Sequence, residues 1–77
     1  MGLRDFGIAE RTAEEVSKLG VTPIDIANRI GCPSQLVRCW LGGTYTPSAY
    51  YLRRLHELGC DVIYILTGKH SGGDADV

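Results

Sequence analysis

The cysteines and histidines of this 77-residue chain are its residues best able to bind a metal or to act as nucleophiles. The three cysteines, Cys32, Cys39 and Cys60, form no Cys-x-x-Cys motif, which fits neither a disulfide framework nor a zinc site. His56 and Cys60 are spaced i, i+4, but two ligands are too few for a metal. We therefore expect no metal site, no cofactor, and thiols that pack as small apolar side chains.

A second set of side chains, between residues 34 and 39, is suited to hydrogen bonding. A glutamine amide such as that of Gln35 can pair with N6 and N7 of adenine. The Arg38 guanidinium can bind guanine or a phosphate, and Ser34 can bond a base edge or a phosphate. Cys39 offers only close contact, for example with a thymine methyl group. On these residues alone, the simpler interpretation is that Gln35 and Arg38 are solvated residues of an amphipathic helix.

Two segments in which apolar residues recur at helical spacing would position these side chains. Val37 and Trp40 lie at i and i+3, so they share one face of a helix that begins near residue 33 or 34 and stops at residues 42–43. In the preceding helix, from residue 23 to residue 30, one face is formed by the apolar residues Ile26, Ala27 and Ile30. Gly31 ends that helix, because glycine takes a left-handed conformation without a Cβ penalty. Two helices joined by a short glycine-containing turn form a helix-turn-helix.

Capping residues predict three further helices. One runs from about Asp5 or Ile8 to Leu19, and another lies between the N-cap Ser48 and Gly59. A short closing helix runs from the N-cap Asp61 to Gly68. The apolar residues that we expect on its inward face are Val62, Ile65 and Leu66. On the first helix, the residues expected to stay outside are Glu10, Arg11, Glu14 and Lys18.

This order of elements resembles the Cro/phage-repressor (XRE-like) helix-turn-helix family of transcriptional regulators. The residues that match the family's small, turn and two core positions are Ala27, Gly31, Val37 and Trp40. The family's loop, fourth helix and closing helix are matched by GGTYTPSAYYLRRLHELGCDVIYILTG. The resemblance covers residues from about 16 to 68. It implies an all-α, compact five-helix lambda-repressor-like domain at residues 1–68, followed by a flexible C-terminal tail at residues 69–77.

The resemblance also implies a function, which is sequence-specific binding of double-stranded DNA by a dimer that recognises a palindromic operator. It places base contacts at Ser34, Gln35 and Cys39, with Arg38 beside them. The positions that it assigns to the DNA backbone are Thr22 and Pro23, at the start of a helix, and Thr44, Tyr45 and Thr46, in a loop.

Two positions depart from the family pattern. Where relatives pair a buried arginine with a glutamate, this chain has Val16 and Leu41, so we expect an apolar contact between the two. In the closing helix, Ile63 replaces a residue that is commonly polar in relatives. We expect Ile63 to point outward beside Tyr64. A single exposed isoleucine is ordinary and needs no explanation; the preferred interpretation is that Ile63 and Tyr64 form a symmetric dimer contact.

Charge is the main argument against DNA binding. The net charge is −1 and the pI is about 6.0, whereas DNA-binding domains are usually basic. The loop at residues 44–46 lacks the lysine or arginine common in relatives, so we expect modest affinity and a shallow salt dependence. The alternative function is a degenerate helix-turn-helix module that binds a protein and does not bind DNA.

Other classes have little support in the sequence. His56 and His70 have no nucleophile or metal set around them, and the chain is small for a substantial pocket, so we expect no enzyme. No apolar run approaches the roughly 18 residues that span a bilayer. The N-terminus lacks the apolar core of a signal peptide, and we therefore expect a cytoplasmic protein.

Overall fold

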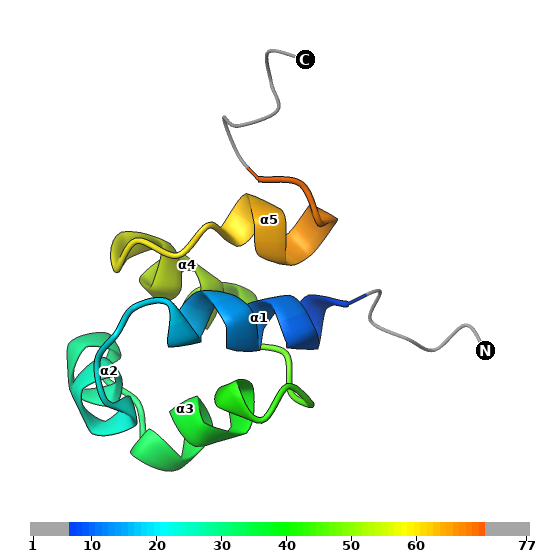
Figure 1. Ribbon diagram of the computed structural model, residues 1–77. Helices are drawn as coiled ribbons and strands as arrows, with labels where there is room; N and C mark the ends of the chain where they lie inside the picture. The colour runs from blue at the N-terminus through cyan, green and yellow to red at the C-terminus, as the bar shows by residue number, and fades with distance from the viewer. Residues whose placement is uncertain (1–6, 71–77) are drawn as a thin grey trace.

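The computed structural model describes residues 7–70, and this part of the chain consists of helices without strands (Figure 1). The helices are α1 (Ile8–Ser17), α2 (Pro23–Ile30), α3 (Ser34–Leu41), α4 (Ala49–Glu57) and α5 (Val62–Thr67). The all-α prediction is confirmed. Within these residues, no helix has the length and apolar character needed to cross a bilayer.

The helix ends lie at the predicted capping residues. The Thr22 hydroxyl accepts a hydrogen bond from the Asp25 N–H (3.1 Å), and Pro23 is the first residue of α2, where no N–H is needed. Gly31 is left-handed (φ 86°) and donates its N–H to the Ala27 carbonyl. The predicted caps Ser48 and Asp61 each accept a backbone hydrogen bond in the same way.

α1 is shorter than predicted at its C-terminal end. It stops at Ser17 instead of Leu19. The Lys18 N–H still makes an α-helical bond to the Glu14 carbonyl, but the next two N–H groups bond only three residues back, from Leu19 to the Val16 carbonyl and from Gly20 to the Ser17 carbonyl. At the other end, α1 begins at Ile8, one of the two predicted starts. Asp5 lies outside the described residues, as do residues 71–77 of the predicted tail.

The core lies where α1 packs against both α3 and α5, while α2 covers α3 (Figure 1). Trp40 is the largest fully buried side chain. The buried apolar residues of this core are Val16, Ile26, Ala27, Ile30, Val37, Trp40, Leu55, Cys60 and Ile65. Leu41 is half-buried and packs against these residues. This agrees with its expected role as an apolar replacement for the arginine–glutamate pair of relatives, while a direct contact between Leu41 and Val16 stays a prediction.

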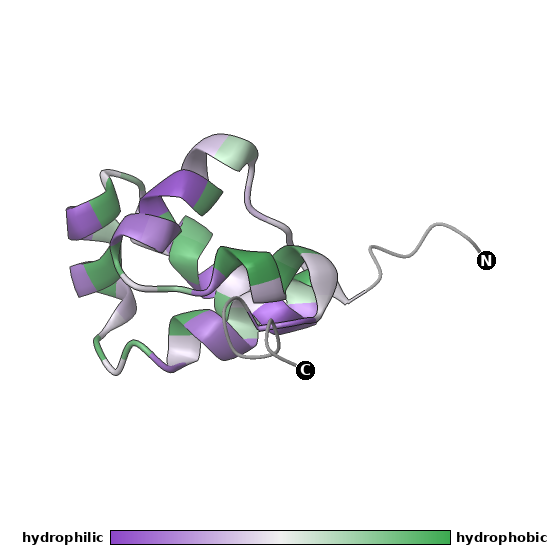
Figure 2. Ribbon diagram, turned by 90° about the horizontal axis from the view of Figure 1, so that it is seen from above, coloured by the Kyte–Doolittle hydropathy of each residue, from purple (hydrophilic) through white to green (hydrophobic). Residues whose placement is uncertain are grey.

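α5 differs from the prediction at one position. Ile65 is fully buried and Ile63 points outward as predicted, but Leu66 is 47% exposed and is not an inward residue. α5 has only six residues, and only the side that meets α1 and α4 is covered by other helices. Leu66 follows the buried Ile65 in sequence, so its side chain lies outside that covered side. Figure 2, which looks down on this helix, shows hydrophobic colour over most of its length.

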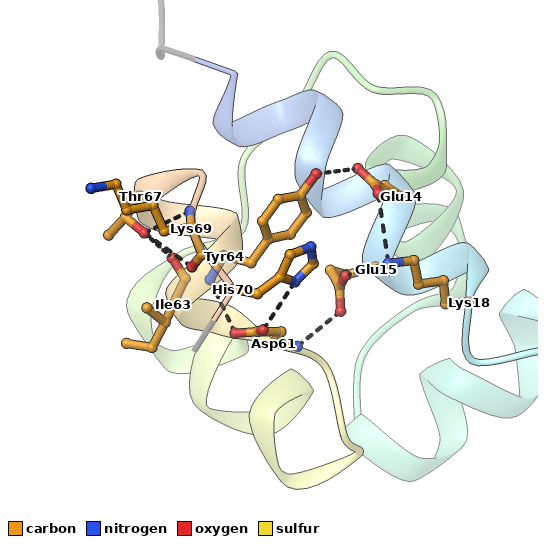
Figure 3. Close-up of polar contacts among 9 residues, drawn as sticks. All are labelled: Glu14, Glu15, Lys18, Asp61, Ile63, Tyr64, Thr67, Lys69 and His70. Atoms are coloured by element: carbon orange, nitrogen blue, oxygen red, sulfur yellow. Dashed lines mark hydrogen bonds and ion pairs between the residues drawn. The ribbon is translucent and has the colours of Figure 1, made fainter. Parts of the chain in front are cut away.

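Three side chains of α1 hold α5 in place. Glu15 accepts the Asp61 N–H (2.9 Å) at the start of α5, and Arg11 Nε donates to the Ile65 carbonyl (3.0 Å) near its end. Between them, the Tyr64 hydroxyl donates to Glu14 (2.7 Å; Figure 3). An acid at the N-terminal end and a base at the C-terminal end complement the helix dipole. The helical pattern predicted Arg11 to lie outside, and this prediction was wrong, because the side chain is half-buried where it bonds the Ile65 carbonyl.

Glu15 is the polar residue that sequence reasoning missed. It is only 6% exposed, and its second carboxylate oxygen accepts a hydrogen bond from Lys18 Nζ at 3.1 Å. The signal was present in the helical spacing, since position 15 lies three residues after Thr12 and four before Leu19. A glutamate within an apolar stripe requires a partner, and the backbone of residue 61 provides it.

The contact between Glu14 and Tyr64 makes stability depend on pH. The hydrogen bond from Tyr64 holds the pKa of Glu14 below its ordinary 4.5. A lowered pKa contributes stability that is present above the unfolded-state pKa and is lost as the pH falls through the folded-state value. We expect Tyr64→Phe to unfold at lower temperature than the wild type at pH 7, and the gap to narrow below pH 4.5. Thermal melts across this pH range measure the gap.

Tyr50→Phe is the control for this measurement, because the Tyr50 phenol is exposed and forms no hydrogen bond within residues 7–70. It is expected to melt as the wild type does at every pH. A gap for Tyr64→Phe that stays constant from pH 7 to pH 3 would contradict the assignment.

Candidate nucleic-acid interface

α3 has one face in the core and one face in solvent. Val37 and Trp40 are 0% and 1% exposed. Gln35 and Arg38 are exposed, and Ser34 and Cys39 are half-buried. With 3.6 residues per turn, Gln35, Arg38 and Cys39 lie on the side of the helix opposite to Val37 and Trp40, and Ser34 lies at the edge of that side. The structure therefore places Gln35 and Cys39, two of the three residues predicted for base contact, on the outer face of α3 together with Arg38, and it places the third, Ser34, at the edge of that face.

The turn between α2 and α3 sets the direction of this face. The N–H groups of Gly31 and Cys32 both donate to the Ala27 carbonyl, at 2.7 and 3.1 Å. Pro33 then takes an extended conformation (φ −66°, ψ 143°) and α3 starts at the next residue. α3 has no side-chain cap and no acidic residue in its first turn. Its first N–H groups and its positive dipole end are thus not neutralised by a carboxylate of its own.

The residues predicted to contact the DNA backbone lie on elements that adjoin α3. Thr22 is exposed and Pro23 is half-buried, at the start of the helix that packs against α3. The Thr22 hydroxyl accepts a bond from Asp25 N–H and keeps its own hydrogen to donate. Thr44 and Tyr45 are both exposed in the loop that leaves α3 through Gly42 and Gly43. Buried Pro47 anchors the other end of that loop.

Charge is unevenly distributed along the chain. Between Asp25 and Glu57, the sequence contains four arginines and no acidic residue. Three of these arginines form ion pairs at the edges of the segment: Arg29 with Asp25 (3.5 Å), and Arg53 and Arg54 with Glu57 (3.6 and 3.1 Å). Arg38 forms no ion pair with any described residue, so its charge is available to a ligand.

The two residues predicted for a dimer contact differ in their surroundings. Ile63 is 48% exposed and lies beside a hollow lined by His56, Gly59, Cys60, Asp61 and Val62. Tyr64 is half-buried, and its ring stacks on His70 at 4.0 Å while its hydroxyl bonds Glu14 (Figure 3). Leu66, at 47% exposure, is the apolar residue of this surface that sequence reasoning missed.

The two residues after Gly68 contact this same end of the molecule. Gly68 is left-handed (φ 83°), and the Thr67 hydroxyl accepts the Lys69 N–H at 3.1 Å. The His70 ring then reaches back to the Asp61 carboxylate at 3.3 Å. Lys69 and His70 belong to the predicted tail, yet both make contacts with the closing helix or its cap.

The free cysteines differ in burial and in chemistry. Cys60 is buried, and burial, with the nearby charge of Glu15, raises the pKa of its thiol to about 11. Burial also raises the pKa of Cys32. Cys39 is half-buried on the outer face of α3. Across residues 7–70, no group of three or more His, Cys, Asp or Glu side chains is arranged to hold a metal ion.

In comparisons with protein-family models, curated proteins and solved structures, nothing matched this chain.

Thiol labelling tests the placement of α3. A pKa of about 11 against the ordinary 9.0 makes the thiolate of Cys60 about a hundredfold scarcer at pH 8 than that of an ordinary cysteine. With a maleimide and peptide mass spectrometry, we expect Cys39 to be labelled well before Cys60. Denatured protein is the control, in which the rates converge. Equal rates in the native protein would contradict the burial of Cys60 and the outward position of Cys39.

Proposed function

We propose that this chain is a sequence-specific DNA-binding transcriptional regulator of the Cro/phage-repressor type, with α3 in the major groove. The observation that carries the proposal is the outer face of α3, which joins Gln35 and an unpaired Arg38 and belongs to a segment without acidic residues. The opposite face of the same helix is locked into the core by Val37 and Trp40. The recognition side chains therefore project from a rigid support.

Each side chain of this face has a distinct role in the proposal. Gln35 pairs bidentately with an adenine, through its N6 and N7 atoms. Arg38 binds a guanine or a phosphate, and Ser34 bonds a base edge or a phosphate at the start of the helix. Cys39 packs against a thymine methyl group. Because base contacts specify sequence while phosphate contacts position the protein, Gln35 is the principal determinant of specificity.

The backbone contacts of the proposal are mostly neutral. Thr22 and the N-terminus of α2 bind phosphate on one side, and Thr44 and Tyr45 bind it on the other. Hydroxyl groups displace fewer counterions than lysine or arginine, so affinity is modest and its salt dependence is shallow. This agrees with the chain's net charge of −1.

The proposed assembly is a homodimer that recognises a palindrome, since a two-fold axis repeats the same half-site one helical turn away. The contact surface is the outer side of α5, where Ile63 and Leu66 are both about half exposed. Tyr64 lies at the edge of this surface. Occlusion of a promoter is then sufficient for repression in a phage- or prophage-like cytoplasmic setting.

Selection from a random duplex library at low salt tests base recognition. We expect a palindrome to be enriched, and Gln35→Ala to cost about 1–3 kcal/mol on it by anisotropy titration, with the preference relaxed at one base pair. Asn28→Ala is the matched control, because Asn28 is an exposed amide on α2 rather than on the face of α3. No enrichment from folded protein would favour the alternative of a protein-interaction module.

Sedimentation equilibrium without DNA tests the dimer. We expect Ile63→Asp combined with Leu66→Asp to shift the protein to monomer, because like charges would face each other across the two-fold axis. Ile24→Asp is the control, since Ile24 is 55% exposed on α2, away from α5. A wild-type protein that sediments as a monomer at every concentration would refute this contact surface.

A further inference from the structure

α2 ends at a carbonyl for which the neighbouring backbone provides no donor. In an α-helix, a carbonyl accepts the N–H four residues later, and for Arg29 that residue is Pro33, which has no N–H. The N–H of Cys32, three residues later, already donates to the Ala27 carbonyl at 3.1 Å. The last turn of α2, just before the turn that leads to α3, therefore needs a hydrogen-bond donor from another part of the chain.

Arg54 of α4 is that donor. Its Nη2 donates to the Arg29 carbonyl at 3.3 Å, across 25 residues of sequence. Its Nη1 donates to the Glu57 carboxylate at 3.1 Å, and this second bond orients the guanidinium. The positive charge also lies at the negative end of the α2 dipole. Arg54 thus caps α2 from a different helix.

The neighbouring arginine shows that the ion pair with Glu57 does not require this position. Arg53 pairs with the same carboxylate at 3.6 Å while its side chain stays 80% exposed. The Nε of Arg54 is instead buried, and it has no hydrogen-bond partner among residues 7–70. A guanidinium in solvent can bond water through every N–H. The comparison indicates that Arg54 is held against α2 by more than its bond to Glu57.

The same side of α4 also contacts α3. Tyr51 lies three residues before Arg54, so the two side chains share one side of the helix. The Tyr51 ring lies 5.5 Å from the ring of Trp40, in the last turn of α3, and is tilted against it. α4 therefore contacts both helices of the helix-turn-helix, α2 through Arg54 and α3 through Tyr51.

We propose that Arg54 is a positioning residue for the recognition helix, because its bond to the last turn of α2 fixes the angle at which the turn directs α3. The inference rests on the proposed DNA-binding function, in which Gln35 and Arg38 contact the DNA from one face. Such a face must be held to within about 10–20° of its productive geometry. Base contacts specify sequence, so a looser turn lowers specificity more than it lowers binding to an arbitrary duplex.

Hydrogen exchange in the free protein tests the positioning without DNA. Arg54→Met removes the donors and keeps an unbranched apolar side chain. We expect the amides of Gly31 and Cys32, in the turn, to exchange about 3- to 10-fold faster. The hydrogen-bonded amide of Ile65, in α5, is expected to keep its wild-type rate, whereas a general loss of stability would accelerate all three. Arg53→Met is the matched control, because it removes the same charge next to the same Glu57 without touching α2.

Anisotropy titrations of the same two variants test the consequence for DNA. We expect Arg54→Met to lower the ratio of operator affinity to scrambled-duplex affinity by about 3- to 10-fold. Arg53→Met is expected to keep the wild-type ratio. Each variant loses one positive charge, so any loss of long-range attraction to the phosphates is common to both.

Wild-type exchange at Gly31 and Cys32 in Arg54→Met, or equal acceleration at Ile65, would overturn the inference. Equal losses on the operator and the scrambled duplex would also overturn it, because they would indicate a direct phosphate contact. The failure of the proposed function looks different. If the wild type selects no sequence and Gln35→Ala changes nothing, the function itself is wrong. If Gln35→Ala relaxes the sequence preference while Arg54→Met keeps it, only the role of Arg54 is wrong.

Discussion

The packing of α1 between α3 and α5 is the contact on which the rest of this small structure depends. The described helices have six to ten residues each, and isolated helices of that length are marginal in water. Their stability must come from tertiary contacts. α1 supplies Val16 to the buried side of α3, and it supplies Arg11, Glu14 and Glu15 to α5. Buried apolar side chains thus hold α3 against α1, whereas hydrogen bonds to the backbone and to the Tyr64 side chain hold α5 against α1.

Because α3 and α5 are anchored in different ways, their outer faces expose different kinds of side chain. Because Trp40 and Val37 anchor α3 from inside, the side chains on its opposite face are free to recognise a ligand without a cost in core packing. α5 is anchored differently, by bonds to its two ends and to Tyr64. Its outward residues Ile63 and Leu66 are therefore left open although they are apolar. The molecule presents a polar, mildly positive face and an apolar face on separate helices.

The distribution of charged residues along the chain matters more for binding an anionic ligand than the net charge does. A chain at −1 is a poor DNA ligand if its charges are evenly mixed. Here the sequence between Asp25 and Glu57 contains no acidic residue, and two of the acids of α1 form the bonds that hold α5. Glu14 and Glu15 are bonded to Tyr64, Lys18 and the backbone of Asp61. Their carboxylates face the α1–α5 contact.

Much of the fold followed from local sequence, because its signals act over a few residues. The caps Thr22, Ser48 and Asp61 and the left-handed Gly31 lie where their chemistry predicts. The two faces of α3 follow from the spacing of Val37 and Trp40. The predictions of side-chain burial were wrong at two positions, where burial depends on which neighbouring helix covers the residue. Leu66 matches the apolar pattern of α5 but has no neighbour to bury it, and Arg11 was assigned to solvent although it bonds the Ile65 carbonyl.

The sequence by itself therefore determined where most helices begin and end, the C-terminal end of α1 excepted, and which side of α3 faces the core, since capping and the 3.6-residue period are local. Only the tertiary structure decided the burial of Glu15, whose partner lies 46 residues away, and the bond from Arg54 to the carbonyl of Arg29. No short-range pattern specifies such contacts, because they form only when distant helices pack side by side.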